Sequence, residues 1–239
     1  MQTTSALYKS IIAGEHWFET RVAINGNEVN EDTIFSIDSD RPGMVANHPS
    51  IGGALSASLR MTLLNPSFSI PQRAEIVVEY RAKNETQTSE WLAAGTYYID
   101  TRKRNASYNA VDTMDITAYD AMIKTEQDYP DTEHDWPYQD RSVVSEIATT
   151  IGVTVDSRTN SFLTRRDMVD LPVNYTMREV LEHIAGANCG NFVITADNKL
   201  LFVPLYGLDP EENLVGNYLT PESSTEALQF GGEGWYILV

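Results

Sequence analysis

The chain has 239 residues, of which 34 are acidic and 17 are basic, so its formal net charge at pH 7 is −17. This balance argues against a specific nucleic-acid-binding surface, because affinity for phosphates comes mostly from Lys and Arg. The single cysteine, Cys189, excludes an intrachain disulfide, and the length is enough for one large or two small domains with their own cores.

The N-terminal stretch 1–19 has no cationic leader, and no apolar run approaches the roughly 18 residues that a membrane span needs. We therefore expect a soluble protein without a membrane anchor, made in a reducing cytoplasm.

The first half of the chain has the pattern of β-structure. In 54–64, Leu55, Ala57, Leu59, Met61 and Leu63 alternate with polar residues, which predicts one strand with one buried face. Turn residues separate the other predicted strands, which are 21–26, 74–82, 95–104 and 111–119. Several such strands in series indicate a small barrel or sandwich.

The cluster "TRKRN" at 101–105 is a local exception to the acidic balance. It could contact phosphate, but a charged strand end on a solvated face is the favoured interpretation.

The segment 129–140 is polar and contains prolines, which predicts a linker or a long loop. The acidic residues in and before it suggest a calcium loop: Glu126, Asp128, Asp131, Glu133 and Asp135. However, Trp136 stands where an EF-hand loop needs glycine, and Pro130 breaks the pattern. A solvated acidic loop is therefore favoured.

Residues 175–204 predict a helix followed by a hairpin. Thr176 and Glu179 have the spacing of a capping box. The apolar stripe that follows predicts a packed helix face and consists of Val180, Leu181, Ile184 and Ala185. Gly190 is predicted to end the helix in a left-handed conformation, and Cys189 to be a small buried residue. Two β-rich runs joined by "ADN" then predict the hairpin.

A weak internal repeat precedes this unit at 142–155. The four stripe positions recur there as Val143, Val144, Ile147 and Ala148, and Gly152 corresponds to Gly190. Chance similarity between two amphipathic helices explains the match equally well.

These patterns predict an α+β protein with three parts. Residues 1–128 form a β-barrel or sandwich domain, and 129–221 form an α+β domain with two helix-strand units. The C-terminal segment 222–239 ends in the apolar run "GWYILV", which is expected to return to a sheet of the first domain, since such a run is costly to leave in water.

The chain has no local motif of the common hydrolases, zinc proteases or nucleotide-binding proteins. Glu179 and His183 lie one helical turn apart and could face a metal, but an exposed contact between them explains the spacing equally well. Glu133, His134 and Asp135 could also bind a metal from a loop, yet neither group has a third ligand at a persuasive spacing. We predict no catalytic, cofactor-binding or metal-binding residue, and no enzyme activity.

Four segments resemble the baseplate hub or tail-associated proteins of phages and prophages of Gram-positive bacteria. They are 49–66, 89–105, 114–130 and 175–194, and the combination of "GTYYID" with "ITAYDAMIKTEQ" is the most specific part. The resemblance implies two tube-type domains, a trimer whose ring continues the tail tube, and no catalysis. It also implies a virion protein at the tail tip, with the distal tail protein and other tail-tip proteins as partners.

An alternative function is a module that binds or hydrolyses cell-wall carbohydrate, since aromatic rings can stack on sugars. It predicts an exposed row of tryptophans beside paired carboxylates, whereas a structural hub predicts burial or subunit contacts for Trp17, Trp91, Trp136 and Trp235.

Overall fold

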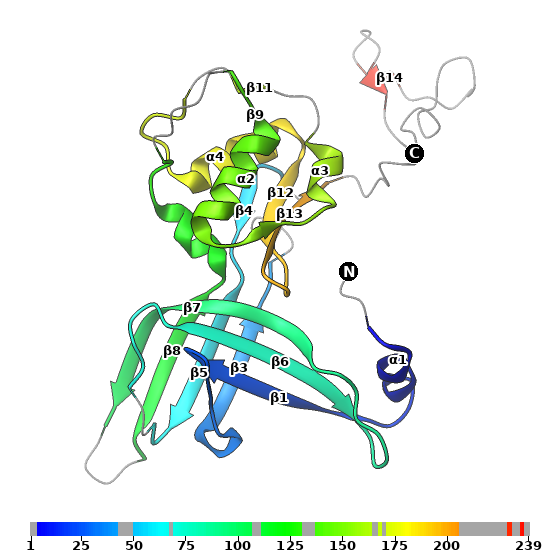
Figure 1. The fold of residues 1–239 in the computed structure, drawn as a ribbon, viewed down its shortest axis with the longest axis vertical. Coiled ribbons are helices and arrows are strands. Elements are labelled where there is room, and N and C mark those ends of the chain that lie inside the picture. The colour runs from blue at the N-terminus through cyan, green and yellow to red at the C-terminus, as the bar shows by residue number, and fades with distance from the viewer. Residues whose placement is uncertain are drawn as a thin grey trace.

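A computed structural model of the chain describes residues 4–42, 50–66, 69–106, 111–130, 137–163, 167–168, 171–205, 229–230 and 235–236. Its described part is built around two sheets (Figure 1). The larger is a curled antiparallel half-barrel, and the smaller carries helices, so the predicted α+β class is confirmed.

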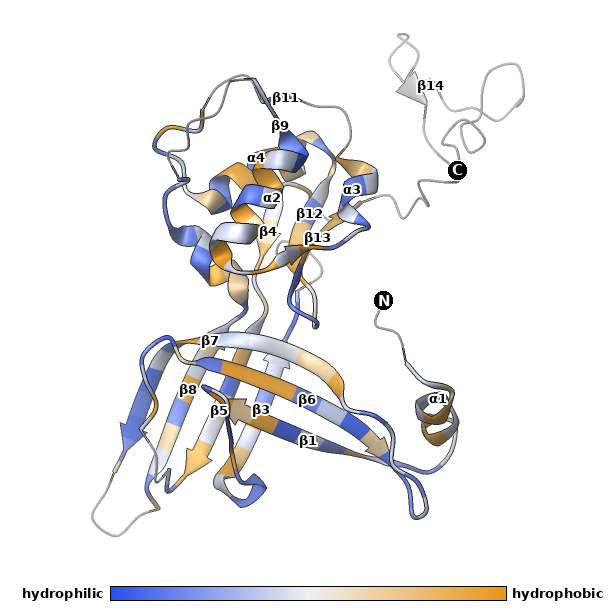
Figure 2. Cartoon of the chain, viewed as in Figure 1, coloured by the Kyte–Doolittle hydropathy of each residue, from blue (hydrophilic) through white to orange (hydrophobic). Residues whose placement is uncertain are grey.

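The half-barrel is a seven-stranded sheet in the order β2-β1-β6-β7-β8-β5-β3. Its strands are β1 (Trp17–Ile24), β2 (Asn27–Glu28), β3 (Ile34–Asp40), β5 (Ser58–Leu64), β6 (Glu75–Lys83), β7 (Leu92–Asn105) and β8 (Thr113–Tyr119). Register shifts in β7 and β3 mark irregularities that help a sheet to bend. Figure 2 shows hydrophobic and hydrophilic bands along these strands, as expected where alternate residues face a core.

Two short elements flank the half-barrel. Helix α1 (Ala6–Ile12) packs beside β6 and buries Ile11, and the 3₁₀ helix η1 (Glu31–Thr33) precedes β3. The Glu90 carboxylate holds the start of α1 by accepting from the backbone N–H of Ser5 at 2.7 Å and from its hydroxyl at 2.6 Å.

The second unit is a four-stranded sheet in the order β10-β13-β12-β4, with helices packed on it. Its strands are β4 (Gly53–Leu55), β10 (Thr154–Val155), β12 (Gly190–Ile194) and β13 (Lys199–Pro204). Its helices are η2 (Ala121–Glu126), α2 (Asp140–Ile151), α3 (Thr159–Phe162) and α4 (Met177–Ala187).

The remaining described strands form two small ribbons. One pairs β9 (Tyr138–Gln139) with β11 (Asp167–Met168), and the other pairs β14 (Gln229–Phe230) with β15 (Trp235–Tyr236). Ile237, on which the predicted return of the C-terminal run depends, lies outside the described residues. The predicted domain limits therefore remain predictions.

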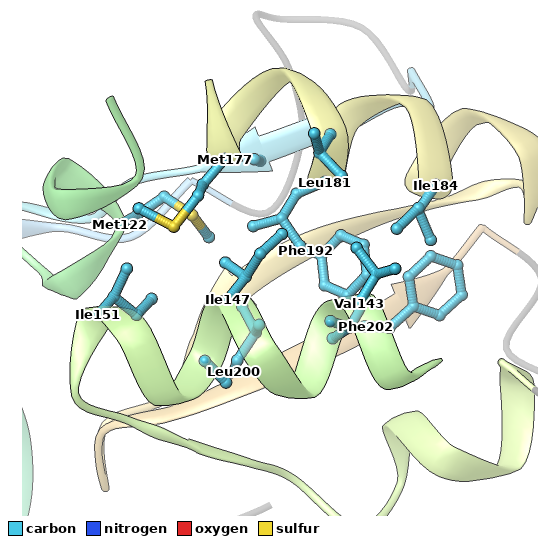
Figure 3. Packing of buried hydrophobic residues seen from close by; sticks show 14 of the residues in the cluster. Met122, Val143, Ile147, Ile151, Met177, Leu181, Ile184, Phe192, Leu200 and Phe202 are labelled. Atoms are coloured by element: carbon cyan, nitrogen blue, oxygen red, sulfur yellow. The ribbon is translucent and has the colours of Figure 1, made fainter. Parts of the chain in front are cut away.

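The core of the second unit lies between α2, α4 and one face of the sheet (Figure 3). Both predicted helix stripes are buried there, which confirms the two apolar faces. Phe192 and Phe202 fill the space beneath the helices from neighbouring strands, with ring centroids 5.2 Å apart.

Three predictions for individual segments were wrong. The alternating run 54–64 is two strands that belong to different sheets: β4 pairs with β12, and β5 pairs with β3 and β8. The alternation shows only which residues share a face, so it cannot tell one continuous strand from two. Gly190 is not left-handed, because Cys189 takes that conformation with φ 55°. Cys189 is exposed, since it stands at the turn before β12 and not within the core.

Gly190 has a different role from the predicted one. It begins β12, and a Cβ atom there would lie 2.4 Å from the Phe202 ring and 2.5 Å from the Val203 carbonyl oxygen. Glycine is therefore required for the close approach of the two strands, and not for backbone freedom.

The predicted capping box is present at the start of α4. The Thr176 hydroxyl accepts from the Glu179 N–H at 3.2 Å, and the Glu179 carboxylate accepts from the Thr176 N–H at 2.7 Å. We expect Thr176→Ala to lower the free energy of unfolding by about 0.5–2 kcal/mol, the usual effect of losing such a cap. A urea melt measures this loss. Thr149→Ala, at an exposed position within α2, is the control and should change little; equal losses in the two variants would contradict the capping role.

Candidate assembly surfaces and the junction between the sheets

The half-barrel has two strand edges that lack partners among the described residues. β3 pairs only with β5, and β1 pairs with β6 on one side but with β2 only at Ala23 and Ile24 on the other. Residues 17–21 of β1 and the outer edge of β3 therefore carry backbone donors and acceptors that have no partner among the described residues. Such edges are templates for pairing with another chain or segment.

Two adjoining grooves lie along these edges, and they share Thr20 and Glu31. The first, called here the acidic groove, has a volume of about 390 Å³ and is lined by Glu19, Thr20, Arg21, Glu28, Val29, Asn30, Glu31 and Trp91. The second, called here the apolar groove, has a volume of about 240 Å³ and is lined by Phe18, Thr20, Glu31, Ile34, Phe35, Ser36 and Ile37.

The apolar groove exposes large side chains at the open side of the sheet. Phe18 is 53% exposed and Phe35 is 70% exposed, although they belong to strands at opposite edges of the sheet. Exposed aromatic residues that gather at two unpaired edges are typical of a surface that another segment covers.

Trp91, at the acidic groove, is not a free stacking platform. The guanidinium groups of Arg21 and Arg81 lie 4.6 and 4.3 Å from its ring centroid, and each is also bound by a cross-strand glutamate. Trp17 is 49% exposed, Trp136 lies outside the described residues, and the side chain of Trp235 is not described. The described residues therefore do not show the row of tryptophans that the carbohydrate-binding alternative predicts.

The side chains whose spacing could suit a metal make other contacts or lie outside the described residues. The Glu179 carboxylate caps α4, and the N–H and hydroxyl of Thr176 lower its pKa. His183 stacks edge-on against Tyr175. Glu133, His134 and Asp135 lie in 131–136, which the structure does not describe. Within the described ranges, no three His, Cys, Asp or Glu side chains gather as metal ligands.

The first two acidic residues of the suggested calcium loop make contacts within the protein. Glu126 forms an ion pair with Arg178 at 2.6 Å, and Asp128 forms an isolated β-bridge with Thr176. None of the described helices is long and apolar enough to cross a membrane.

Asp120 lies where the chain passes between the two sheets, and no pattern in the sequence indicated its role. It is 2% exposed and directly follows β8. Its carboxylate accepts from the Ser56 hydroxyl at 2.9 Å, from the Ala57 N–H at 2.8 Å and from the Met122 N–H at 3.1 Å. Asp120 thus joins the two chain segments that cross between the sheets, the one from β4 to β5 and the one from β8 to η2. Burial raises the pKa of Asp120 to about 6, although these donors oppose the shift.

Two arginines complete the junction. Arg178 of α4 donates to the Ala54 carbonyl at 2.5 Å and to the Met122 carbonyl at 3.3 Å, so it holds β4 and η2 to the helix. Arg41, after β3, donates to the carbonyls of Ala94 in β7 and Ile194 in β12, and therefore joins the two sheets. Side chains that bind backbone carbonyls leave no periodic pattern, so the sequence could not indicate these contacts.

Asn191 holds β4 against β12. Its side-chain oxygen accepts from the Gly53 N–H, and its amide donates to the Ser50 carbonyl, each at 2.8 Å. A strand of three residues would otherwise have few bonds to the sheet, so this side chain extends the ladder.

No protein-family model and no curated protein sequence matches the chain. Among solved structures, the tail protein from Neisseria meningitidis MC58 matches with a TM-score of 0.52 and 12% identity, over 77% of this chain and 51% of that one. The 43 kDa tail protein of prophage MuSo2 from Shewanella oneidensis matches with a TM-score of 0.52 and 14% identity, over 78% of this chain and 53% of that one. The chain shares their fold and spans about half of their length.

Proposed function

We propose that this chain is a structural component of a phage tail. The observation that carries the proposal is the fold that it shares with two tail proteins over more than three quarters of its length. The open half-barrel supports it, because free strand edges suit a protein that is completed by its neighbours. The proposal requires no catalytic residue.

Within the tail, we propose a place at the tip, as a trimeric hub whose ring continues the tail tube. The resemblance of the four sequence segments supports this place, with the distal tail protein and other tail-tip proteins as neighbours. Head-to-tail contacts close into a ring only if each rotation returns to the start. An acidic wall would also suit a conduit for DNA, because like charges do not adhere.

Cryo-electron microscopy of assembled tail tips tests the proposed function directly. We expect this chain in a closed ring on the tube axis, and light scattering of the purified protein should show association that rises with concentration. A peripheral position off the axis would contradict the hub, and turnover of peptidoglycan by the purified protein would support the hydrolytic alternative. A stable complex of the purified protein with duplex DNA in 150 mM salt would contradict the proposal that the chain forms the acidic wall of a DNA conduit.

We further propose that the C-terminal run 234–239 returns to the half-barrel and covers the apolar groove. The two free edges and the exposed Phe18 and Phe35 support this placement, because an apolar run needs such a surface. In a Cys189→Ser background, Phe35→Cys with Ile237→Cys should form an intrachain disulfide. The control variant carries Val173→Cys with Ile237→Cys. Val173 lies on the second unit and is 61% exposed. A disulfide only in that control would place the run on the second unit instead.

A further inference from the structure

The end of β7 is a free strand edge that carries the basic cluster of the chain. β6 pairs with β7 only as far as Tyr98, whereas β8 pairs with it to Asn105. Residues 101–105, called here the basic arm, therefore have one edge without a partner strand among the described residues (Figure 1). Their side chains are exposed. The hydrophilic end of this strand is evident in Figure 2.

Two cations of the basic arm are available for another partner. Asp112 binds Arg104 with two hydrogen bonds from Nε, at 3.0 and 3.1 Å, and an ion pair to Nη2. Arg102 and Lys103 have no ion pair within the described part of the chain. Arg102 lies opposite Ile116 and Lys103 lies opposite Asp115, so the two cations point to opposite faces of the sheet. On a chain with a net charge of −17, they are positive charges on either side of one open strand edge.

The acidic groove contains two carboxylates that also lack an ion pair among the described residues. Glu19 is neutralised there by Arg81 at 2.8 Å and Lys83 at 3.1 Å, and Arg21 is neutralised by Glu79. Glu28 and Glu31 are exposed and have no ion pair among the described residues. The groove therefore retains two negative charges beside a free strand edge.

Other strands separate the basic arm from Glu28 and Glu31 within one chain. Through β1 and β6, Glu28 is level with Thr96 of β7, about 20 Å along that strand from Arg102 at roughly 3.3 Å per residue. On the other side of the sheet, β8 and β5 lie between the arm and β3, so Arg104 is three strands, about 14 Å, from Ile34. Within the described part of the chain the arm forms no ion pair with either carboxylate, so both charged surfaces remain available to a second molecule.

We propose that the open edge of the basic arm of one copy docks against the acidic groove of a second copy, so that Arg102 and Lys103, on opposite faces of the strand, lie near Glu28 and Glu31. The contact is heterologous, head to tail, and so can repeat around a ring. This inference rests on the proposed function and deepens it by naming the surfaces that join the subunits. Exposed ion pairs are individually weak, so their main effect is on register and on the rate of association.

Charge reversal with complementary mixing tests the contact. The variants are Arg102→Glu with Lys103→Glu, and Glu28→Lys with Glu31→Lys, each in the full chain. Sedimentation velocity at 50 mM salt should show association at least about tenfold weaker for each variant alone, because attraction is replaced by repulsion. An equimolar mixture of the two should recover most of the association, since every junction between unlike copies then pairs opposite charges again. Circular dichroism melts confirm that both variants fold.

Matched controls separate this contact from net charge. Lys9→Glu with Arg141→Glu makes the same change in net charge as the arm variant, at exposed positions elsewhere, and should leave association nearly unchanged. Glu15→Lys with Glu85→Lys serves the groove variant in the same way.

The outcomes of this experiment distinguish the docking inference from the proposed tail function. Association that is unaffected by either reversal, or reduced equally by the controls, would overturn the docking inference and leave the tail function standing. If the wild-type chain stays monomeric, carbodiimide coupling of isotope-labelled and unlabelled copies in assembled tails decides instead. Lys103 joined to Glu28 or Glu31 between copies supports the inference, and intermolecular links elsewhere without this one overturn it. A tail tip without a ring of this chain would overturn the proposed function itself.

Discussion

Phe202→Ala is expected to lower the free energy of unfolding by about 3–5 kcal/mol, the usual effect of emptying a buried aromatic site. Phe202 is 1% exposed and contacts Phe192 across the two strands and Phe162 from α3, with ring centroids 5.2 and 6.0 Å apart. Because α2 and α4 both rest on this face of the sheet, the surroundings have little freedom to close the cavity (Figure 3).

Denaturant unfolding of both variants in one series measures this loss. Val203→Ala, on the next residue of β13 but 40% exposed on the other face, is the matched control and should cost less than about 1 kcal/mol. Similar losses for the two variants would mean that the core does not lie between the helices and this face.

The stability of the protein is expected to rise as the pH falls from 7 to 5, because of Asp120. Its pKa in the folded protein is about 6, above the ordinary value of 3.8. The folded state therefore binds the proton more tightly than the unfolded state does. The stabilising effect of protonation is complete below pH 3.8 and is lost as the pH rises through 6. At about 1.4 kcal/mol per pKa unit, the full effect between the two pKa values is about 3 kcal/mol, of which about 1.3 kcal/mol falls between pH 7 and pH 5.

Urea melts at pH 5, 6 and 7 measure this dependence, and Asp120→Asn should remove most of it. The carboxyl groups whose pKa values are lowered by cationic partners, such as Asp156 at about 2, titrate below this range. Asp38→Asn, at an exposed position of β3, is the control and should keep the wild-type slope. An unchanged slope in Asp120→Asn would show that another group causes the pH dependence.

Asp120→Ala tests the structural role of the same carboxylate. Its loss leaves the N–H groups of Ala57 and Met122 without their acceptor, at about 1–3 kcal/mol for each buried donor. Part of this loss is offset at pH 7, because the buried charge is also removed. We therefore expect the Ala variant to be destabilised more strongly at pH 5 than at pH 7.

The sequence by itself determined the local elements of this protein. Strands β1, β6, β7 and β8 follow from alternation and turn residues, and α4 follows from the Thr176 cap and its apolar stripe. These features depend on residues within one or two turns of each other, so a pattern along the chain records them. The basic arm was visible for the same reason, as a cluster of like charges.

The tertiary structure alone decided which elements share a sheet and how the units are joined. The alternation through Leu55 and Leu59 is unbroken, yet β4 and β5 belong to different sheets, because Asn191 and Asp120 bind the backbone on either side of the crossing. Those side chains lie 138 and 63 residues from the groups that they bind. Contacts of this range depend on how the chain folds back on itself, and no local period encodes them. The free edges of β1 and β3 are likewise a property of the assembled sheet, since each strand by itself has the same backbone donors and acceptors as any other.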